Sequence, residues 1–415
     1  MSDLPHPLRA TIGGFLFLCL AQPAFSHDSP PPAPSAVPGA AAEPLGEDQI
    51  LDTRTAVVDL ATLTNLEALI PRLADRRVVF VGEAHDRYED HLNQLAIIRG
   101  LHQQGTALAI GMEMFQQPFQ PALDAYIAGE IDEDEMLRRT DYFERWRFDY
   151  RLYRPILRFA REKGIPVIAL NLEREITGKV GDGGLESLSA DERARIPAEI
   201  DNDDSAYRER VKAVFDLHPK GWQEQAEGDD KDEGKDEGKA FERFLSVQLL
   251  WDEGMAERAA RYLQDHPDKR MVILAGSGHL EYGQGIPKRL LRRLPLSSAI
   301  VLNGGMRDLD PQAADYLLFP RRVELAATGR LGVMLDTEAK GPGVAVQGFS
   351  DNSGAAAAGM KEGDRILRVG DKDIGVYADI RLALIDSRPG QKLPVEVERG
   401  AADAADRLTL EVELH

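Results

Sequence analysis

Five short runs of apolar, mostly β-branched residues restrict what this chain can fold into. Each run is apolar throughout instead of alternating with polar residues, which is typical of a strand buried on both faces. Stretches of amphipathic, helix-length sequence separate them, at 89–103, 149–163 and 241–263. The runs are 77–81, 107–110, 166–170, 271–275 and 299–302. This repeated strand–helix–strand order predicts an α/β domain with a mostly parallel sheet and helices on both faces.

Charge and cysteine content exclude several classes of function. The chain has 415 residues, with 50 Lys+Arg against 70 Asp+Glu, so its formal net charge is −20. A protein this acidic lacks the basic face that nucleic-acid binding needs, and we expect no nucleic-acid partner. Its single cysteine, Cys19, excludes a disulfide framework, a cysteine-ligated zinc site and a covalently attached c-type haem.

The N-terminal part of the chain has the pattern of an export signal and a linker. Residues 1–26 contain Arg9, a short apolar run and small residues at a cleavage site, which predicts a signal peptide and a periplasmic protein. Lipid attachment at Cys19 is the alternative. Residues 27–47, rich in proline and alanine, predict an extended tether. We expect no transmembrane segment in the mature chain, because no other apolar run is long enough to cross a bilayer.

The remaining chain divides into two predicted domains. The α/β domain covers 48–322 and the second domain covers 323–415. Within the first, residues 227–239 repeat Lys-Asp-Glu-Gly twice in tandem. This acidic, low-complexity stretch predicts a solvated loop.

The loops after the predicted strands carry the residues capable of chemistry. The carboxyl ends of parallel strands meet at one edge of a sheet, where ligand sites of α/β proteins lie. Residues 82–85 (GEAH) follow the first run and 276–279 (GSGH) follow the fourth, so two strands end in the same Gly-x-x-His motif. Glu113 also follows the second run, after Gly111 and Met112. We therefore expect one cleft that contains Glu83, His85, Glu113 and His279.

Such a cleft supports two kinds of chemistry. His85, His279 and Glu83 could hold a divalent metal ion that lowers the pKa of a bound water. Without metal, Glu83 or Glu113 could act as a general base while a histidine protonates a leaving group. Asp252, on the predicted 241–263 helix, lies on the face expected to pack toward the sheet. A buried carboxylate there needs a partner, which makes it a candidate for supporting this cleft.

These motifs resemble the ChaN-like haem-binding uptake family of the Tiki superfamily. The resemblance covers roughly residues 55–320 and is carried by 82–85, 111–114 (GMEM) and 276–279. It implies non-covalent haem binding linked to haem or iron uptake, with a tyrosine ligand at a subunit interface and hence a homodimer. Esterase-like and protease members of the superfamily use the matching histidines and acidic residues for hydrolysis. A metal-dependent hydrolase is therefore the alternative function.

An arginine stripe gives a further argument for haem. Arg147, Arg151 and Arg154 repeat at helical spacing beside Tyr150. A basic stripe next to aromatic rings suits a flat ligand that bears carboxylates, such as haem. The alternative is a solvated arginine face paired with surface acids. These four residues are our candidates for haem binding.

Residues 323–415 resemble a PDZ domain, a small β-rich module. Residues 330–333 (RLGV) resemble its carboxylate-binding loop, in which backbone N–H groups receive the carboxylate of a peptide terminus. The resemblance implies a peptide or protein C-terminus as partner. The residues that it assigns to the groove are Leu331, Gly332, Val333 and Leu384. A third interpretation of the whole chain follows, in which it is a non-catalytic adaptor that works through this groove.

Overall fold

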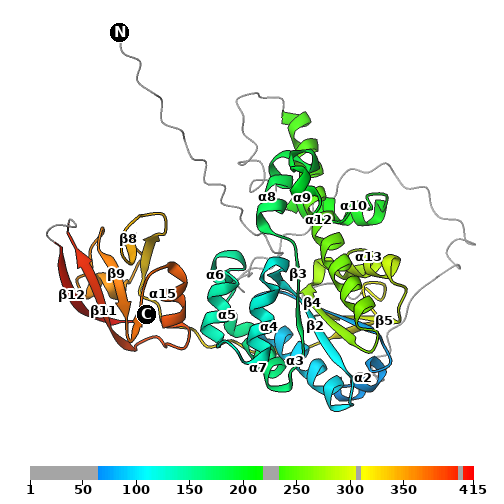
Figure 1. Ribbon diagram of the computed structural model, residues 1–415, viewed down its shortest axis with the longest axis horizontal. Helices are drawn as coiled ribbons and strands as arrows, with labels where there is room; N and C mark the ends of the chain where they lie inside the picture. Colours follow the sequence, from blue (N-terminus) through cyan, green and yellow to red (C-terminus); the bar gives the residue numbers. More distant parts are fainter. Residues whose placement is uncertain (1–63, 218–232, 305–309, 401–404) are drawn as a thin grey trace, which may run out of the picture.

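The structure is a computed structural model that describes residues 64–217, 233–304, 310–400 and 405–415 (Figure 1). The predicted signal peptide, the tether and residues 227–232 of the acidic stretch lie outside these ranges. None of the described helices is long and apolar enough to cross a membrane.

A six-stranded sheet forms the centre of the large domain, as the apolar runs predict. Its strands are β1 (Val78–Glu83), β2 (Leu108–Gln116), β3 (Val167–Asn171), β4 (Arg270–Gly276), β5 (Ser298–Asn303) and β6 (Tyr316–Leu318). Their order in the sheet is β3-β2-β4-β1-β5-β6, and every neighbouring pair is parallel. The sheet is therefore the parallel one expected, with β6 added as a short edge strand.

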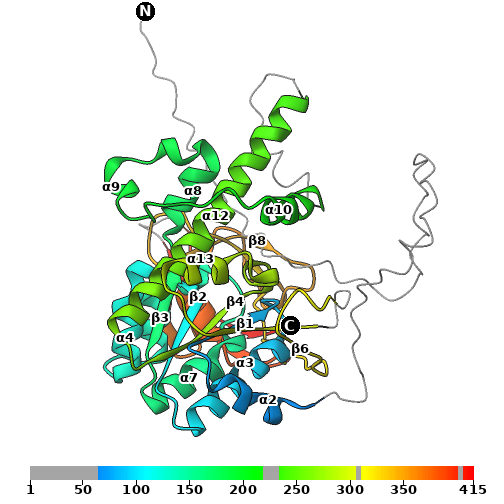
Figure 2. The same ribbon diagram turned by 90° about the vertical axis from the view of Figure 1, so that its right-hand side faces the viewer.

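Helices cover both faces of this sheet. They are α2 (Leu66–Leu73), α3 (Tyr88–Gln103), α4 (Gln120–Ala128), α5 (Glu133–Arg139), α6 (Tyr142–Arg145), α7 (Arg154–Lys163), α8 (Arg174–Gly183), α9 (Ala190–Arg193), α10 (Ser205–Leu217), α12 (Glu233–Asp265) and α13 (Ile286–Arg293). Figure 2 shows α13 and α12 on one side of the strands and α3 and α7 on the other. In β1, Val79 and Val81 pack with the α3 and α7 layer, whereas Val78 and Phe80 pack with α12 and α13. Burial on both faces explains why the run is apolar throughout.

The predicted helix over 149–163 is wrong in its first residues. The segment starts with a 3-10 turn, η3 (Tyr150–Leu152), and α7 begins only at Arg154. Pro155 explains the break, because proline lacks the N–H that a continuous helix needs and is tolerated only in the first turn, where it lies in α7. Arg147 has a left-handed backbone with φ of 70°. The arginines therefore do not form the stripe of one helix.

The prediction of a loop at 227–239 is also wrong for its second half. α12 begins at Glu233, so residues 233–239 form its first two turns. This helix has 33 residues, and at 1.5 Å per residue it is about 50 Å long, much longer than a strand of the sheet. Its N-terminal part extends beyond the sheet and packs against α8 and α10 (Figure 1).

The C-terminal domain is an antiparallel sheet with two short helices, as the PDZ resemblance predicts. Its elements are β7 (Val333–Asp336), β8 (Val344–Phe349), α14 (Gly354–Ala357), β9 (Arg365–Val369), β10 (Lys372–Asp373), α15 (Tyr377–Leu384), β11 (Lys392–Arg399) and β12 (Asp406–Glu413). The strand order is β12-β11-β9-β8-β7, with β10 beside β9. β7 is thus an edge strand, and α15 contains Leu384, one of the residues assigned to the groove.

α15 packs against the large domain, next to α5 and α6 (Figure 1). Leu382 is 1% exposed and belongs to the same apolar core as residues of α5 and α6. Asp379 accepts a hydrogen bond from Nε of Arg138 at 2.9 Å. The guanidinium of Arg381 lies 5.2 Å from the centre of the Phe143 ring. Apolar, ionic and cation–π contacts therefore hold the two domains together.

Candidate functional site

The structure brings the four predicted cleft residues together at the carboxyl edge of the sheet. Glu83 ends β1, Glu113 lies in β2, and His279 lies in the 3-10 turn η5 (Ser277–His279) directly after β4. Nε2 of His279 is 3.5 Å from Oε1 of Glu113, whose Oε2 accepts the Gly276 N–H at 2.7 Å. A Cβ on Gly276 would lie only 3.0 Å from Cε1 of His85. Glycine at this position therefore lets the His85 ring reach the same edge.

Glu83 orients His85. Nδ1 of His85 is 2.8 Å from Oε1 of Glu83, and the Tyr153 hydroxyl donates to the same oxygen at 3.0 Å. The rings of Trp146 and Phe148 lie 4.9 and 5.0 Å from the His85 ring, centre to centre. Because Nδ1 faces the carboxylate, Nε2 is the nitrogen that faces Gly276 and Glu113.

The other oxygen of Glu83 is held by residues of α3. Oε2 accepts a hydrogen bond from Gln94 Nε2 at 2.7 Å and lies 3.1 Å from Nδ1 of His91. Nε2 of His91 faces the backbone carbonyl of His85 at 3.2 Å. Both ring nitrogens of His91 thus face acceptors, so both must carry a proton. Burial alone would lower the pKa of His91, but the Glu83 carboxylate raises it above its usual value. In turn, burial would raise the pKa of Glu83, but the charge of His91 and its bonds to both histidines hold it well below its usual range.

Asp252 orients His279 in the same way. Nδ1 of His279 is 2.6 Å from Oδ1 of Asp252, a fully buried residue of α12. The Tyr207 hydroxyl, from α10, donates to Oδ2 of Asp252 at 2.7 Å. Burial would lower the pKa of His279, but the carboxylates of Asp252 and Glu113 raise it. The partner that a buried Asp252 needs is therefore the second Gly-x-x-His histidine.

We call Glu83, His85, Glu113, Asp252 and His279 the imidazole centre. In the part of the chain that the structure describes, no three or more His, Cys, Asp or Glu side chains are arranged to hold a metal ion. Both oxygens of Glu83 already accept hydrogen bonds. The geometry therefore gives Glu83 the role of orienting His85. Two imidazoles on either side of a carboxylate can carry out acid–base chemistry.

The structure does not gather the four predicted haem-binding residues on one open face. Tyr150 is fully buried, and Arg154 pairs with Asp386 at 2.5 Å and with Glu133 at 2.9 Å. The other two arginines differ in exposure. Arg151 forms a salt bridge with Asp149, whereas the side chain of Arg147 is exposed. Of these candidates, only Arg147 therefore presents its side chain to solvent.

Sequence reasoning missed Tyr282, which lies three residues after His279. It is 41% exposed and has a left-handed backbone with φ of 58°. Its hydroxyl donates to Oδ2 of Asp310 at 3.0 Å, and this bond raises the pKa of the phenol. A non-glycine residue in this conformation is strained, and such strain is most frequent at functional sites. Its position directly after a Gly-x-x-His motif is the one signal in the sequence that could have found it.

Of the predicted peptide-binding residues, Leu331 and Gly332 directly precede β7, Val333 begins it, and Leu384 ends α15. Gly332 has φ of 76°, which glycine adopts without strain, and a Cβ there would lie 2.7 Å from Cε1 of His415. The last residue of the chain thus lies beside the predicted carboxylate-binding loop. Val333 and Leu384 are half-buried, whereas Leu331 is 2% exposed and belongs to the domain core.

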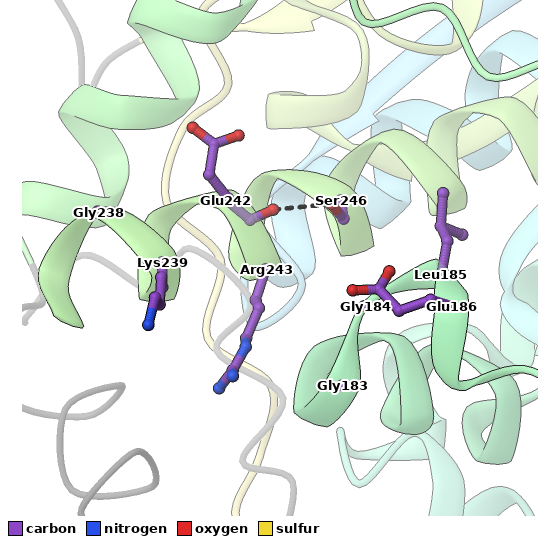
Figure 3. Close-up of a pocket in the computed structure, with 9 residues that line it drawn as sticks. All are labelled: Gly183, Gly184, Leu185, Glu186, Gly238, Lys239, Glu242, Arg243 and Ser246. Carbon is purple, nitrogen blue, oxygen red and sulfur yellow. Dashed lines mark hydrogen bonds between the residues drawn. The ribbon is translucent and has the colours of Figure 1, made fainter. Parts of the chain in front are cut away.

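A surface hollow of about 580 Å³ lies away from the imidazole centre, between α8, η4 (Leu185–Ser187) and α12. Figure 3 shows Lys239 and Arg243 pointing to the same side of α12, and the Ser246 hydroxyl bonded to the carbonyl of Glu242. The hollow is lined by positively and negatively charged side chains, and none of its residues belongs to the imidazole centre. We assign no chemistry to it.

Three known proteins are similar to parts of this chain. The Arabidopsis thaliana protein RETICULATA-RELATED 5, chloroplastic, is 23% identical over an alignment 256 residues long. The alignment covers 56% of this chain and about a third (31%) of that relative's length. A structure of ChaN of Campylobacter jejuni, described as showing cofacial heme binding, is 19% identical, covers 61% of this chain and 91% of its own, and has a TM-score of 0.47. A mutant erythromycin esterase, EreC, is 16% identical, covers 68% and 78%, and has a TM-score of 0.34.

Two families match the chain, one in each domain. Residues 329–414 match the PDZ domain. Residues 69–290, more than half of the chain, match the family described as haem-binding uptake, Tiki superfamily, ChaN. The match includes both Gly-x-x-His motifs and every residue of the imidazole centre. The chain therefore belongs to the ChaN-like haem-binding family of the Tiki superfamily and carries a PDZ domain at its C-terminal end.

Proposed function

We propose that this protein binds haem non-covalently through its ChaN-like domain and acts in haem or iron uptake as an exported protein. The observation that carries this proposal is the family match over residues 69–290. Bound haem would supply the iron that such a protein carries.

The imidazole centre itself does not fit a whole haem. The side chains of His85 and His279 are 9% and 14% exposed, which leaves no open face for a porphyrin ring. Tyr282 fits better, because its phenol reaches the surface and Asp310 could accept the proton that the phenol loses on binding iron. We therefore place the haem ligand at Tyr282, outside the centre.

A haemin titration of residues 27–415, followed by the Soret band, tests this proposal. We expect saturable binding that weakens about tenfold, or about 1.4 kcal/mol, in Tyr282→Phe. Tyr262→Phe is the matched control, since this tyrosine of α12 stacks on His266, just after the helix. The double variant His85→Ala/His279→Ala should keep the Soret shift. The absence of a saturable shift in the native chain would overturn the proposal.

For the PDZ domain we propose that it recruits the C-terminus of a peptide or protein. A peptide would add as a strand to β7, which lies at the edge of its sheet. Two exposed apolar residues flank this place, Met334 in β7 and Val376 just before α15. Their chemistry favours a partner with apolar residues near its C-terminus.

A second candidate function is acid–base hydrolysis at the imidazole centre. The observation that favours it is that a buried carboxylate holds Nδ1 of each histidine. Nε2 of His279 then faces Glu113, and Nε2 of His85 faces Gly276, whose N–H donates to Glu113. A water would attack an ester carbonyl and pass its proton to Nε2 of His85. The raised pKa of His279 suits it to give a proton to the leaving alkoxide.

Release of acetic acid from ethyl acetate, followed by titration at constant pH, tests this candidate, because the ethoxide leaving group needs a proton. Hydrolysis should fall about 100-fold or more in His85→Ala and in His279→Ala, because general acid–base groups contribute factors of that order. A chelator distinguishes the metal-dependent form of the reaction from the metal-free form. Equal rates in the native chain and both variants would contradict the candidate.

A further inference from the structure

Each histidine of the imidazole centre is oriented by a carboxylate that a buried tyrosine holds in turn. Tyr153 donates to Glu83, which faces His85, and Tyr207 donates to Asp252, which faces His279. The two arms are built from unrelated parts of the chain. Tyr153 precedes α7, whereas Tyr207 lies in α10, outside the sheet.

In the first arm, a hydrogen bond from Trp146 orients the hydroxyl of Tyr153. Tyr153 is fully buried, and its hydroxyl oxygen accepts a hydrogen bond from Nε1 of Trp146 at 3.2 Å. The Trp146 ring also packs on the His85 ring. The hydroxyl proton of Tyr153 is therefore directed at Oε1 of Glu83, the oxygen that faces Nδ1 of His85.

In the second arm, the Tyr207 ring makes cation–π contacts with two arginines. The guanidinium of Arg289 is 4.6 Å from the centre of the ring, and that of Arg210 is 5.3 Å from it. Arg210 also donates to the carbonyl of Gly278 at 2.8 Å, next to His279. α10 thus holds both the carboxylate and the loop of the second Gly-x-x-His motif.

Burial of a tyrosine near this centre does not by itself bring a carboxylate partner. Tyr142 lies in α6, in the same apolar core as Tyr153, and is 1% exposed. Its hydroxyl has no hydrogen-bond partner among the described residues. Burial raises the pKa of Tyr153 and Tyr207, so both remain donors. Their bonds to Glu83 and Asp252 are therefore specific features of the two arms.

We propose that Tyr153 and Tyr207 are positioning residues, each of which fixes the carboxylate that keeps one imidazole in its Nδ1–H form, with Nε2 directed toward Gly276 in His85 and toward Glu113 in His279. An imidazole exists in two neutral tautomers, and the hydrogen bond at one nitrogen decides which form is present. A carboxylate that loses the tyrosine proton can rotate and hold Nδ1–H less well. The catalytic part of this role rests on the hydrolase function proposed above.

NMR of the full chain tests the proposal without any substrate. The Nδ1–H protons of His85 and His279 should each give a low-field resonance that exchanges slowly with water, besides those of His91, which shares Glu83. Tyr153→Phe should change the His85 resonance and leave that of His279 unchanged, and Tyr207→Phe should do the reverse. Exchange of the affected proton should be about tenfold faster, the order expected when one hydrogen bond to a charged group is lost. Tyr142→Phe removes a hydroxyl without a partner among the described residues and should change neither. Assignment uses His85→Ala and His279→Ala.

The outcomes separate this proposal from the proposed hydrolase. If the tyrosine variants change both resonances alike, or neither, the positioning role is overturned. If each variant changes its own resonance and the native chain hydrolyses no ester, the positioning role stands and the hydrolase function fails. If the positioning role and the hydrolase function both hold, each Tyr→Phe variant should lower kcat for ethyl acetate about tenfold with KM unchanged. Circular dichroism of all variants should match the native chain, which excludes misfolding.

Discussion

At the scale of single residues, His91 is central to the charge state of the site. Its two protons face the Glu83 carboxylate and the His85 carbonyl, so it places a positive charge beside a buried negative one. Removal of one partner of such a buried pair leaves the other charge uncompensated, which is costly. His91 therefore keeps Glu83 ionised, and an ionised Glu83 is what holds the Nδ1 proton of His85.

Asp90, the neighbour of His91, gives a prediction about pH. It is 2% exposed; its Oδ2 accepts the Ala84 N–H at 2.9 Å, and burial raises its pKa from 3.8 to about 6. A carboxyl group whose pKa is raised in the folded state favours folding below pH 3.8, and this contribution is lost as the pH rises through 6. Asp90→Asn keeps an acceptor for Ala84 but has no charge to bury. We expect it to be more stable than the native chain at pH 7, by an amount on the order of 1–3 kcal/mol.

Urea unfolding at pH 4 and pH 7 measures this effect. The difference in the free energy of unfolding between Asp90→Asn and the native chain should be small at pH 4 and grow toward pH 7. Asp86→Asn changes an exposed carboxylate of the same loop and is the matched control. A difference that stays constant with pH would contradict the assignment of Asp90 as the group responsible.

At the scale of secondary-structure elements, the sequence was sufficient for every strand of the sheet except the edge strand β6. The five predicted runs are recognisable because strands buried on both faces are apolar throughout. β6 has three half-buried residues, which leave no such pattern. The start of α7 was mispredicted because the apolar spacing continues through Pro155, and only the proline signals the break. The tandem acidic repeat reads as a loop, yet its second half continues into α12, whose later residues are well packed.

The imidazole centre was predictable in part for a similar reason. Glu83 ends β1, and His85 and His279 closely follow β1 and β4, whereas Glu113 lies within β2, just after its predicted apolar run. The rule that the ends of parallel strands converge was therefore enough to group them. Tyr153 and Tyr207 carry no such signal, because they come from a loop and a helix far from both motifs in the sequence. Their positions depend on how the helices pack on the sheet, which the spacing of apolar residues does not determine.

At the scale of the whole molecule, the PDZ helix α15 also contributes to the core of the large domain. α15 is a wall of the predicted peptide groove, and it also contributes Leu382 to the apolar core of the large domain. On the large-domain side, the contact reaches α6, whose Phe143 faces Arg381. The residue after α6 is Trp146, which packs on His85. These contacts connect the PDZ domain to the helices beside His85, so we expect the PDZ domain to stabilise the large domain.

Replacement of Leu382 tests this support. Leu382→Ala leaves a cavity between the domains and should lower the free energy of unfolding by about 2–5 kcal/mol. Tryptophan fluorescence is a suitable probe, because all three tryptophans, Trp146, Trp222 and Trp251, precede the PDZ domain. The urea midpoint seen by tryptophan should therefore fall although the substitution lies in the other domain. Leu410→Ala removes a side chain packed only on the PDZ core and should move this midpoint less. An unchanged tryptophan midpoint in Leu382→Ala would mean that the large domain is stable without the contact, and that the two domains merely lie side by side.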